Sequence, residues 1–196
     1  MGGGEMLIGY ALCGSFCTIS RSIRVMEALV REGHTLVPIM SECAYSTDTR
    51  FGKAADIRAS IERICGREII HTVKDAEPLG PDIHLDMLVV APCTGNTLAK
   101  LAHGITDGAV TMACKAHLRS DRPLLLALAT NDALSANLEN IARMLKRRSV
   151  YFTPMLQDDV TRKPHSLVAE LERIPDAIHA ASEGSQLRPL FVSNND

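Results

Sequence analysis

Hydroxyl, amide and glycine residues follow four apolar segments of this 196-residue sequence, at the point where each apolar segment ends. The four polar groups are Gly14-Ser15 with Thr18, Ser41, Thr94-Gly95-Asn96-Thr97, and Thr130-Asn131. Small hydroxyl and glycine residues let backbone N–H groups approach a phosphate closely. The chemistry that these groups predict is the binding of a phosphate or a similar anion, and ordinary turn formation is the alternative for each group taken singly.

The richest of the four groups lies between an expected strand and an expected helix. Residues 86–91 are mostly apolar and β-branched, which is typical of a buried parallel strand. Pro92 has no N–H for the ladder, so we expect the strand to stop there. Thr94 or Asn96 is expected to cap a helix that reaches about residue 102. The N–H groups and dipole of such a helix N-terminus favour an anion.

The elements that must position these groups follow from hydrophobic periodicity. We expect strands at 6–12, 35–40, 68–71, 86–91, 123–128 and 150–152. We expect helices at 19–31, 49–65, 94–102, 109–118, 134–145 and 166–181, with caps at 47–49 and Ser166 and a stop at Gly66. Strands separated by helices predict an α/β fold with a mostly parallel, doubly wound sheet, whose carboxyl edge gathers the four groups in one crevice.

Composition narrows the class of protein. With 46% hydrophobic residues, residues 1–196 suit a single domain with loose tails at 1–5 and about 183–196. A formal net charge of -2 and only 4% aromatic residues argue against a nucleic-acid partner. No apolar run approaches the ~20 residues that span a bilayer, so no membrane partner is expected. The sequence has neither a GxGxxG fingerprint nor a GxxxxGK[ST] loop.

Six cysteines stand at scattered positions, without zinc-ribbon or CxxC spacing. We therefore expect no metal site and a reduced, cytoplasmic protein. Cys93 follows the strand expected at 86–91 and is a candidate nucleophile, but no partnering histidine is evident in the sequence. A buried structural thiol is the preferred interpretation of Cys93.

At the level of motifs, the chain resembles the flavin-dependent cysteine decarboxylase superfamily of flavoproteins. The match rests first on Gly14-Ser15 after the first expected strand. It rests also on the superfamily pattern A-P-x-[ST]-A-N-T-x-x-K-x-A-x-G-I-x-D, which is fitted by Ala91-Pro92, Thr94, Asn96-Thr97 and the run from Lys100 to Asp107. It extends over about residues 6–190. The resemblance implies a three-layer Rossmann-like or flavodoxin-like domain, a homo-oligomer, and a flavin mononucleotide (FMN) site between subunits.

Individual site residues follow from the same resemblance. Gly14, Ser15, Ser41 and Thr94 would hold the phosphate and ribityl chain, with Thr18 and Gly95 in the same cofactor-binding set. Asn96, Thr97 and Asn131 would approach the flavin ring or the substrate. Asn96 and Asn131 are also the candidates for a catalytic role.

Two departures from the superfamily argue against cysteine decarboxylation. Pro78 stands where the decarboxylases carry a histidine, and residues 128–135 keep only Asn131 of their P-x-M-N-x-x-M-W segment. Further stretches at 47–52, 75–81, 130–134, 151–152 and 157–158 resemble an oxidoreductase-subunit branch of the superfamily. That branch implies oxidation of a dihydrodipicolinate-type precursor to pyridine-2,6-dicarboxylate, in the mother cell of a sporulating bacterium.

The same branch implies a companion subunit that resembles an NAD(P)-dependent dehydrogenase. A non-catalytic partner subunit without functional flavin remains an alternative, as does an FMN-dependent decarboxylase. For a dicarboxylate substrate we expect cationic side chains beside the crevice, and Arg50, Lys115 and Arg119 are the candidates. The alternative for each of these three is a solvated surface charge.

Overall fold

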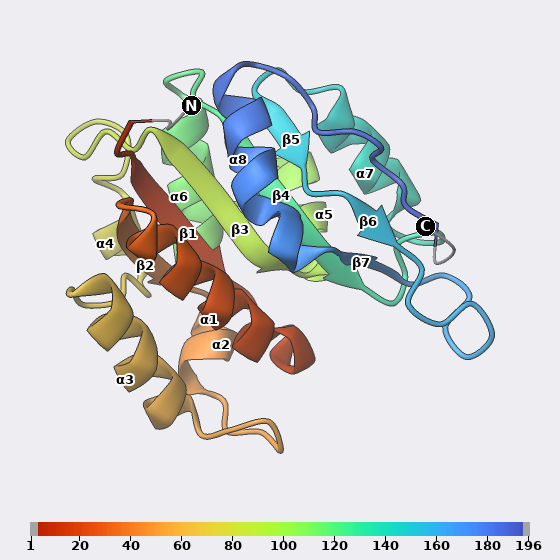
Figure 1. The fold of residues 1–196 in the computed structure, drawn as a ribbon, viewed down its shortest axis with the longest axis horizontal. Helices are drawn as coiled ribbons and strands as arrows, with labels where there is room; N and C mark the ends of the chain where they lie inside the picture. Colours follow the sequence, from red (N-terminus) through yellow and green to blue (C-terminus); the bar gives the residue numbers. More distant parts are fainter. Residues whose placement is uncertain (1–3, 194–196) are drawn as a thin grey trace.

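The computed structural model describes residues 4–193, and within them seven strands form one mixed sheet covered by helices on both faces (Figure 1). The strands are β1 (Leu7–Leu12), β2 (Thr35–Met40), β3 (Met87–Cys93), β4 (Leu124–Thr130), β5 (Val150–Phe152), β6 (Met155–Leu156) and β7 (Leu167–Ala169). Their order is β2-β1-β3-β4-β7-β6, and β5 also pairs with β4. Strands β1 to β5 run parallel, whereas β7 is antiparallel to β4 and to β6.

The helices divide between the two faces of the sheet. They are α1 (Phe16–Arg31), α2 (Glu42–Ser46), α3 (Ala54–Cys65), α4 (Val73–Ala76), α5 (Gly95–His103), α6 (Ala109–Leu118), α7 (Leu138–Leu145) and α8 (Ile174–Ser182), with a 3₁₀ turn at Leu171–Arg173. In Figure 1, α1, α3 and α8 lie in front of the sheet, and α5 and α6 lie behind it. The predicted doubly wound α/β architecture is confirmed.

Alternating side chains of each central strand fill two separate cores. Leu88 and Val90 of β3 point to the core under α5 and α6, while Met87 and Val89 point to the core under α1 and α8. Because both faces are covered, the parallel strands are apolar throughout rather than alternating with polar residues. Burial of these strands is what holds the carboxyl edge of the sheet in place.

One buried polar contact ties α1 to the sheet near that edge. The hydroxyl of Tyr10 lies 3.0 Å from Oγ of Ser22, and the Ser22 hydroxyl donates to the carbonyl oxygen of Ala91 at 2.5 Å. Tyr10 and Ser22 are both fully buried. Each polar atom therefore has a partner inside the core, as a buried hydroxyl requires.

The strands predicted at 6–12, 35–40, 86–91 and 123–128 are confirmed, but the end predicted for the strand at 86–91 is wrong. Strand β3 continues through Pro92 to Cys93, and the pairing register with β4 shifts between Val90 and Cys93. A proline at an irregularity of the ladder removes no regular hydrogen bond. The strand predicted at 68–71 is also wrong, because Ile70 forms only an isolated bridge with Ile39.

Two predicted helix starts are wrong as well. The helix expected from 49 begins at Ala54, and the side chain of Asp48 instead accepts a hydrogen bond from the Ala54 N–H at 2.8 Å. Ser166 caps no helix, since it is buried directly before β7. The last helix begins at Ile174, with a proline in its first turn. The predicted stop at Gly66 is confirmed by its left-handed backbone.

Further differences concern α2, α7 and the chain ends. Helix α2 was not predicted, and α7 begins at Leu138 rather than 134. The side-chain amide of Gln186 exchanges two hydrogen bonds with the backbone of Phe152, at 2.8 and 2.6 Å, so this part of the predicted tail is packed. Residues 1–3 and 194–196 of the predicted tails lie outside the described residues. Among the described residues, no helix has the length and apolar character to cross a bilayer.

Candidate functional site

Two adjoining cavities open at the carboxyl edge of the sheet. The α1 cavity, of about 520 Å³, lies between the starts of α1 and α5, the end of β4 and the segment 157–165. The α6 cavity, of about 440 Å³, lies between the starts of α2, α5 and α6. Gly14, Thr94 and Asn96 line both cavities, so the two share a wall. Each cavity is of the size that proteins use for small ligands.

The structure brings the nine predicted cofactor-binding residues to these two cavities. Ser15, Thr18, Gly95 and Asn131 line the α1 cavity. Ser41 and Thr97 line the α6 cavity, and the three shared residues complete the set. Residues from four strand-to-helix connections therefore meet at one place. The role of each residue in binding remains a prediction.

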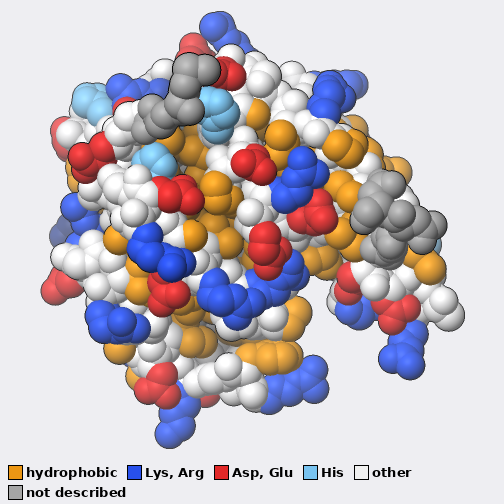
Figure 2. Space-filling view, viewed as in Figure 1, with side chains coloured by type: hydrophobic (Ala, Val, Ile, Leu, Met, Phe, Trp, Pro, Cys, Tyr) orange, Lys and Arg blue, Asp and Glu red, His pale blue; other side chains and the backbone are white. Residues whose placement is uncertain are grey.

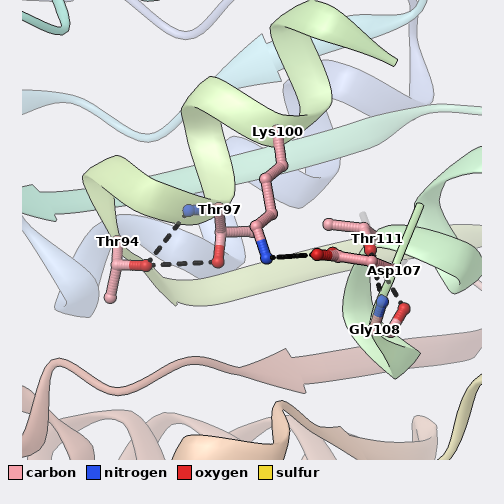
Figure 3. Close-up of polar contacts among 6 residues, drawn as sticks. All are labelled: Thr94, Thr97, Lys100, Asp107, Gly108 and Thr111. Atoms are coloured by element: carbon pink, nitrogen blue, oxygen red, sulfur yellow. Dashed lines mark hydrogen bonds and ion pairs between the residues drawn. The ribbon is translucent and has the colours of Figure 1, made fainter. Parts of the chain in front are cut away.

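The first turn of α5 is held by a chain of hydroxyl contacts (Figure 3). Thr94 Oγ1 accepts the N–H of Thr97 at 3.3 Å, which confirms Thr94 as the N-cap, and donates to Thr97 Oγ1 at 3.1 Å. Thr97 Oγ1 in turn donates to Cys13 Sγ at 3.2 Å. Burial raises the pKa of the Cys13 thiol to about 11, against the lowering effect of the Thr97 hydrogen bond. This chain fixes α5 against the end of β1.

An ion pair forms part of the wall of the α6 cavity. The ammonium of Lys100 points to the carboxylate of Asp107, with Nζ–O distances of 2.8 and 2.9 Å (Figure 3). This hydrogen bond from Lys100 is the largest cause that lowers the pKa of Asp107. Next to it, Thr111 Oγ1 accepts the N–H of Gly108 at 3.1 Å and so holds the start of α6. With Glu42, the described lining of the α6 cavity has two acidic side chains and one basic side chain.

Two serine hydroxyls keep a hydrogen that a ligand can accept. Ser15 Oγ accepts from Thr18 Oγ1 at 3.1 Å, and Ser41 Oγ accepts from the N–H of Ala44 at 3.3 Å. Because a hydroxyl donates as well as accepts, both serines retain an O–H for an anion. A Cβ added to Gly14 would lie 3.2 Å from Cys43 Sγ, so a side chain there would crowd Cys43. Its backbone is outside the left-handed region, so space is the reason for glycine at this position.

A polar cluster around Asp132 packs against Gly95 at the start of α5. Asp132 Oδ1 accepts from Thr130 Oγ1 at 2.5 Å and from the side-chain amide of Asn137 at 2.9 Å. Asn140 donates to Asn137 Oδ1 at 2.9 Å. Asp132 follows the polar pair Thr130-Asn131 in sequence, which is a usable signal. Asn137 and Asn140 gave no signal, because nothing in a local pattern shows that they face Asp132.

The three cations predicted for a dicarboxylate do not line either cavity. Arg50 is exposed and its guanidinium lies 4.8 Å from the centre of the Phe51 ring. Lys115 and Arg119 are exposed in and just after the last turn of α6, whereas the start of that helix borders the α6 cavity. The structure therefore does not bring these three side chains to the crevice of the single chain, and their role in substrate binding stays a prediction. The cations that line the α1 cavity are Arg21 and Lys163.

Cys93 is fully buried, as the preferred interpretation expected. Burial raises the pKa of its thiol well above the ordinary value, and its neighbours Cys13 and Cys114 act in the same direction. A thiol held in its protonated form is a poor nucleophile. The described residues contain no cluster of three His, Cys, Asp or Glu side chains that could hold a metal ion.

Comparison with known proteins assigns the chain to one family. The Flavoprotein family model matches residues 4–181. The dipicolinate synthase B subunit of Bacillus subtilis (strain 168) is 42% identical over 187 residues, which cover 95% of this chain and 94% of that protein. The crystal structure of the dipicolinate synthase B subunit from Bacillus halodurans has a TM-score of 0.90 at 38% identity, with 98% and 99% of the two chains covered. Flavin prenyltransferase UbiX of Neisseria meningitidis serogroup B is 25% identical over 164 residues, covering 83% of this chain and 82% of that protein.

Proposed function

Because this chain belongs to the flavoprotein family, we propose that it binds FMN at the junction of the α1 and α6 cavities and acts as one component of a dipicolinate synthase. The observation that carries the proposal is the meeting of nine predicted residues around that junction. They come from four connections that are far apart in sequence. Similarity over 95% of the chain to a dipicolinate synthase component supports the choice of reaction.

The residues at the junction fit the phosphate and ribityl chain of FMN. Gly14 has no side chain at the wall that the two cavities share, and the hydroxyls of Ser15 and Ser41 each have a hydrogen to donate. The starts of α1 and α5 both face the shared wall, and the first N–H groups of a helix have no carbonyl partner within it. Together with the two helix dipoles, these donors suit a dianionic phosphate.

The reaction proposed is the oxidation of a dihydrodipicolinate-type precursor to pyridine-2,6-dicarboxylate, which removes two electrons and two protons. FMN, when bound, supplies an acceptor for the two electrons. The chain itself would bind and orient the precursor. The amides of Asn96 and Asn131 each offer donors and an acceptor at the cavity wall, so they are the residues proposed to contact the reacting ring.

An NAD(P)-dependent companion subunit is part of the proposal, since the similar synthase protein is named as one subunit among others. We place the complex in the cytoplasm of the mother cell of a sporulating bacterium. Similarity to flavin prenyltransferases keeps an FMN-dependent activity of another kind as a second candidate. Against a cysteine decarboxylase stands Pro78, which offers no ionisable group where those enzymes carry a histidine.

Reconstitution tests this function. The chain would be purified, freed of flavin, and combined with the companion subunit, NAD(P)⁺ and the precursor, with and without added FMN. We expect the ultraviolet absorbance of pyridine-2,6-dicarboxylate to rise faster with FMN than without it. Equal rates with and without FMN would identify a non-catalytic partner subunit instead. Release of CO₂ from a cysteinyl peptide would identify a decarboxylase.

A further inference from the structure

We propose that Arg21 and Lys163 bind the two carboxylates of the substrate in the α1 cavity. The inference rests on the proposed function and adds to it the place and the residues of substrate binding. Both side chains line this cavity, one from α1 and one from the segment 157–165, which are far apart in sequence. Neither was identified from the sequence.

Arg21 lines the α1 cavity, and its guanidinium is paired with the carboxylate of Glu172. Its Nε and Nη2 donate to the two carboxylate oxygens of Glu172 at 3.0 and 2.6 Å. That bidentate pair orients the planar group and leaves Nη1 outside the pair. An arginine guanidinium is charged at all ordinary pH values, and the hydrogen bond to Glu172 is the largest cause that raises the pKa of Arg21 further. A second carboxylate can therefore bind without breaking the first pair.

Lys163 supplies the second cation of the lining, from the segment 157–165. Its Nζ donates to Asp158 Oδ2 at 2.8 Å, and an ammonium has three N–H donors. The segment that carries Lys163 is held by its own contacts, with the N–H of Arg162 donating to Asp159 Oδ1 at 2.8 Å. In Figure 1 this segment projects beyond β6 and β7. Figure 2 shows a notch between the projecting lobe and the body of the molecule.

The rest of the lining includes two apolar side chains that can contact the faces of an aromatic ring. Ala129 of β4 and Val168 of β7 face each other across the antiparallel pair and both line the cavity. Both cations of the α1 cavity are paired with a carboxylate, Lys163 with Asp158 and Arg21 with Glu172. The α6 cavity instead has one acid in excess, because Glu42 accompanies the Lys100–Asp107 pair among its described residues. A dicarboxylate is therefore favoured in the α1 cavity over the α6 cavity by charge.

Calorimetric titration of the full chain with pyridine-2,6-dicarboxylate, in the presence of FMN, tests the proposal. We expect Lys163→Gln and Arg21→Gln each to weaken binding at least about tenfold, the loss expected for one charged hydrogen bond. The matched controls are Lys74→Gln and Arg67→Gln, which remove the same charges at exposed positions outside both cavities. They should bind as wild type does. Pyridine-2-carboxylate, with one carboxylate, should bind wild type more weakly than the dicarboxylate.

Two further measurements separate this proposal from its alternatives. Because Arg21→Gln leaves Glu172 without its partner, the double variant Arg21→Gln/Glu172→Gln is titrated too, and thermal melts confirm that each variant is folded. FMN affinity is measured for every variant, since a phosphate has the same anionic chemistry as a carboxylate. Unchanged FMN affinity with weakened dicarboxylate binding supports the proposal.

Three results would overturn the proposal. The first is weakened FMN binding with unchanged dicarboxylate binding, which would assign the two cations to the cofactor phosphate. The second is equal dicarboxylate affinity in wild type and all variants while FMN still binds, which would leave the proposed function standing. The third is no binding of the dicarboxylate by wild type up to millimolar concentration. Failure of FMN to bind wild type would instead overturn the proposed function.

Discussion

A Cβ atom added to Gly95 would lie 2.9 Å from Oδ1 of Asp132. The first turn of α5 and the segment after β4 therefore touch without space for a methyl group. The same added atom would lie 2.6 Å from Thr130 Oγ1 and 2.6 Å from the amide nitrogen of Asn137. This contact joins two of the strand-to-helix connections that line the α1 cavity. It makes the geometry of the cavity depend on glycine at this position.

Gly95→Ala should therefore both destabilise the protein and weaken FMN binding. Overpacking of this kind costs about 1–3 kcal/mol, because three hydrogen-bonded atoms must shift together. Urea unfolding and FMN titration measure the two effects. Gly4→Ala is the control, since a Cβ there would meet no atom within 4 Å. A Gly95→Ala protein with the stability and affinity of wild type would show that the contact is loose.

The Lys100–Asp107 pair predicts a specific acid dependence of stability. Lys100 lowers the folded-state pKa of Asp107 below its ordinary value of 3.8. Because its pKa is lower in the folded state, the ionised carboxylate of Asp107 stabilises the folded protein at pH values above its unfolded-state pKa. This stabilisation is lost as the pH falls through the folded-state pKa. The free energy of unfolding of wild type should exceed that of Asp107→Asn at neutral pH, and the difference should shrink to zero in strong acid. A difference that is constant down to about pH 2 would contradict this.

The cysteines should separate into two classes of reactivity. Cys17 and Cys43 are exposed, and they line the α1 and α6 cavities respectively. Burial raises the pKa of Cys13, Cys93 and Cys114, so these thiols should resist iodoacetamide in the folded protein.

Alkylation followed by peptide mass spectrometry measures this pattern, and unfolding in urea is the control that should make all of the thiols reactive. FMN should slow the labelling of both exposed cysteines, whereas pyridine-2,6-dicarboxylate should slow only Cys17. If FMN changed the labelling rate of neither Cys17 nor Cys43, the cofactor would bind elsewhere.

We expect the chain to form a homo-oligomer, as the resemblance to its superfamily implies. Leu138 and Leu145 of α7 are exposed by 50% and 37%, and Phe51 and Phe191 by 52% and 55%, so apolar side chains are available for contact. Light scattering at micromolar concentration should give the mass of two or more chains, each of 21.3 kDa. A particle of 21.3 kDa alone would contradict this expectation.

The central fold could be predicted because its signals are local. Each central parallel strand is an apolar run in the sequence. The starts and ends of helices are indicated by residues such as Thr94 and Gly66. Strand β7 could not be predicted, since its three residues carry no periodicity and Ser166 before it resembles a helix cap. The pairing of β7 with β4 is a long-range contact that only the folded chain reveals.

The candidate site divides in the same way. The meeting of the nine candidate residues at one place could be predicted because the carboxyl ends of parallel strands lie at one edge of the sheet. Their roles in cofactor binding came from the family resemblance and stay a prediction. The two cations of the α1 cavity were not predicted, because Arg21 lies on a helix surface and Lys163 in an irregular segment. Arg50, Lys115 and Arg119 have the right charge, but no local rule assigns a surface side chain to a cavity.

The most direct test of the account is the affinity of the chain for FMN, measured by quenching of flavin fluorescence. Ser15 makes no hydrogen bond that caps α1, so Ser15→Ala removes a proposed phosphate donor without removing a helix cap. The matched control is Ser20→Ala, at an exposed position of the same helix. We predict that Ser15→Ala weakens FMN binding about tenfold to a hundredfold, the effect of one hydrogen bond to a charged acceptor, and that Ser20→Ala binds as wild type does. Equal affinities of wild type, Ser15→Ala and Ser20→Ala would contradict the proposed position of the cofactor phosphate.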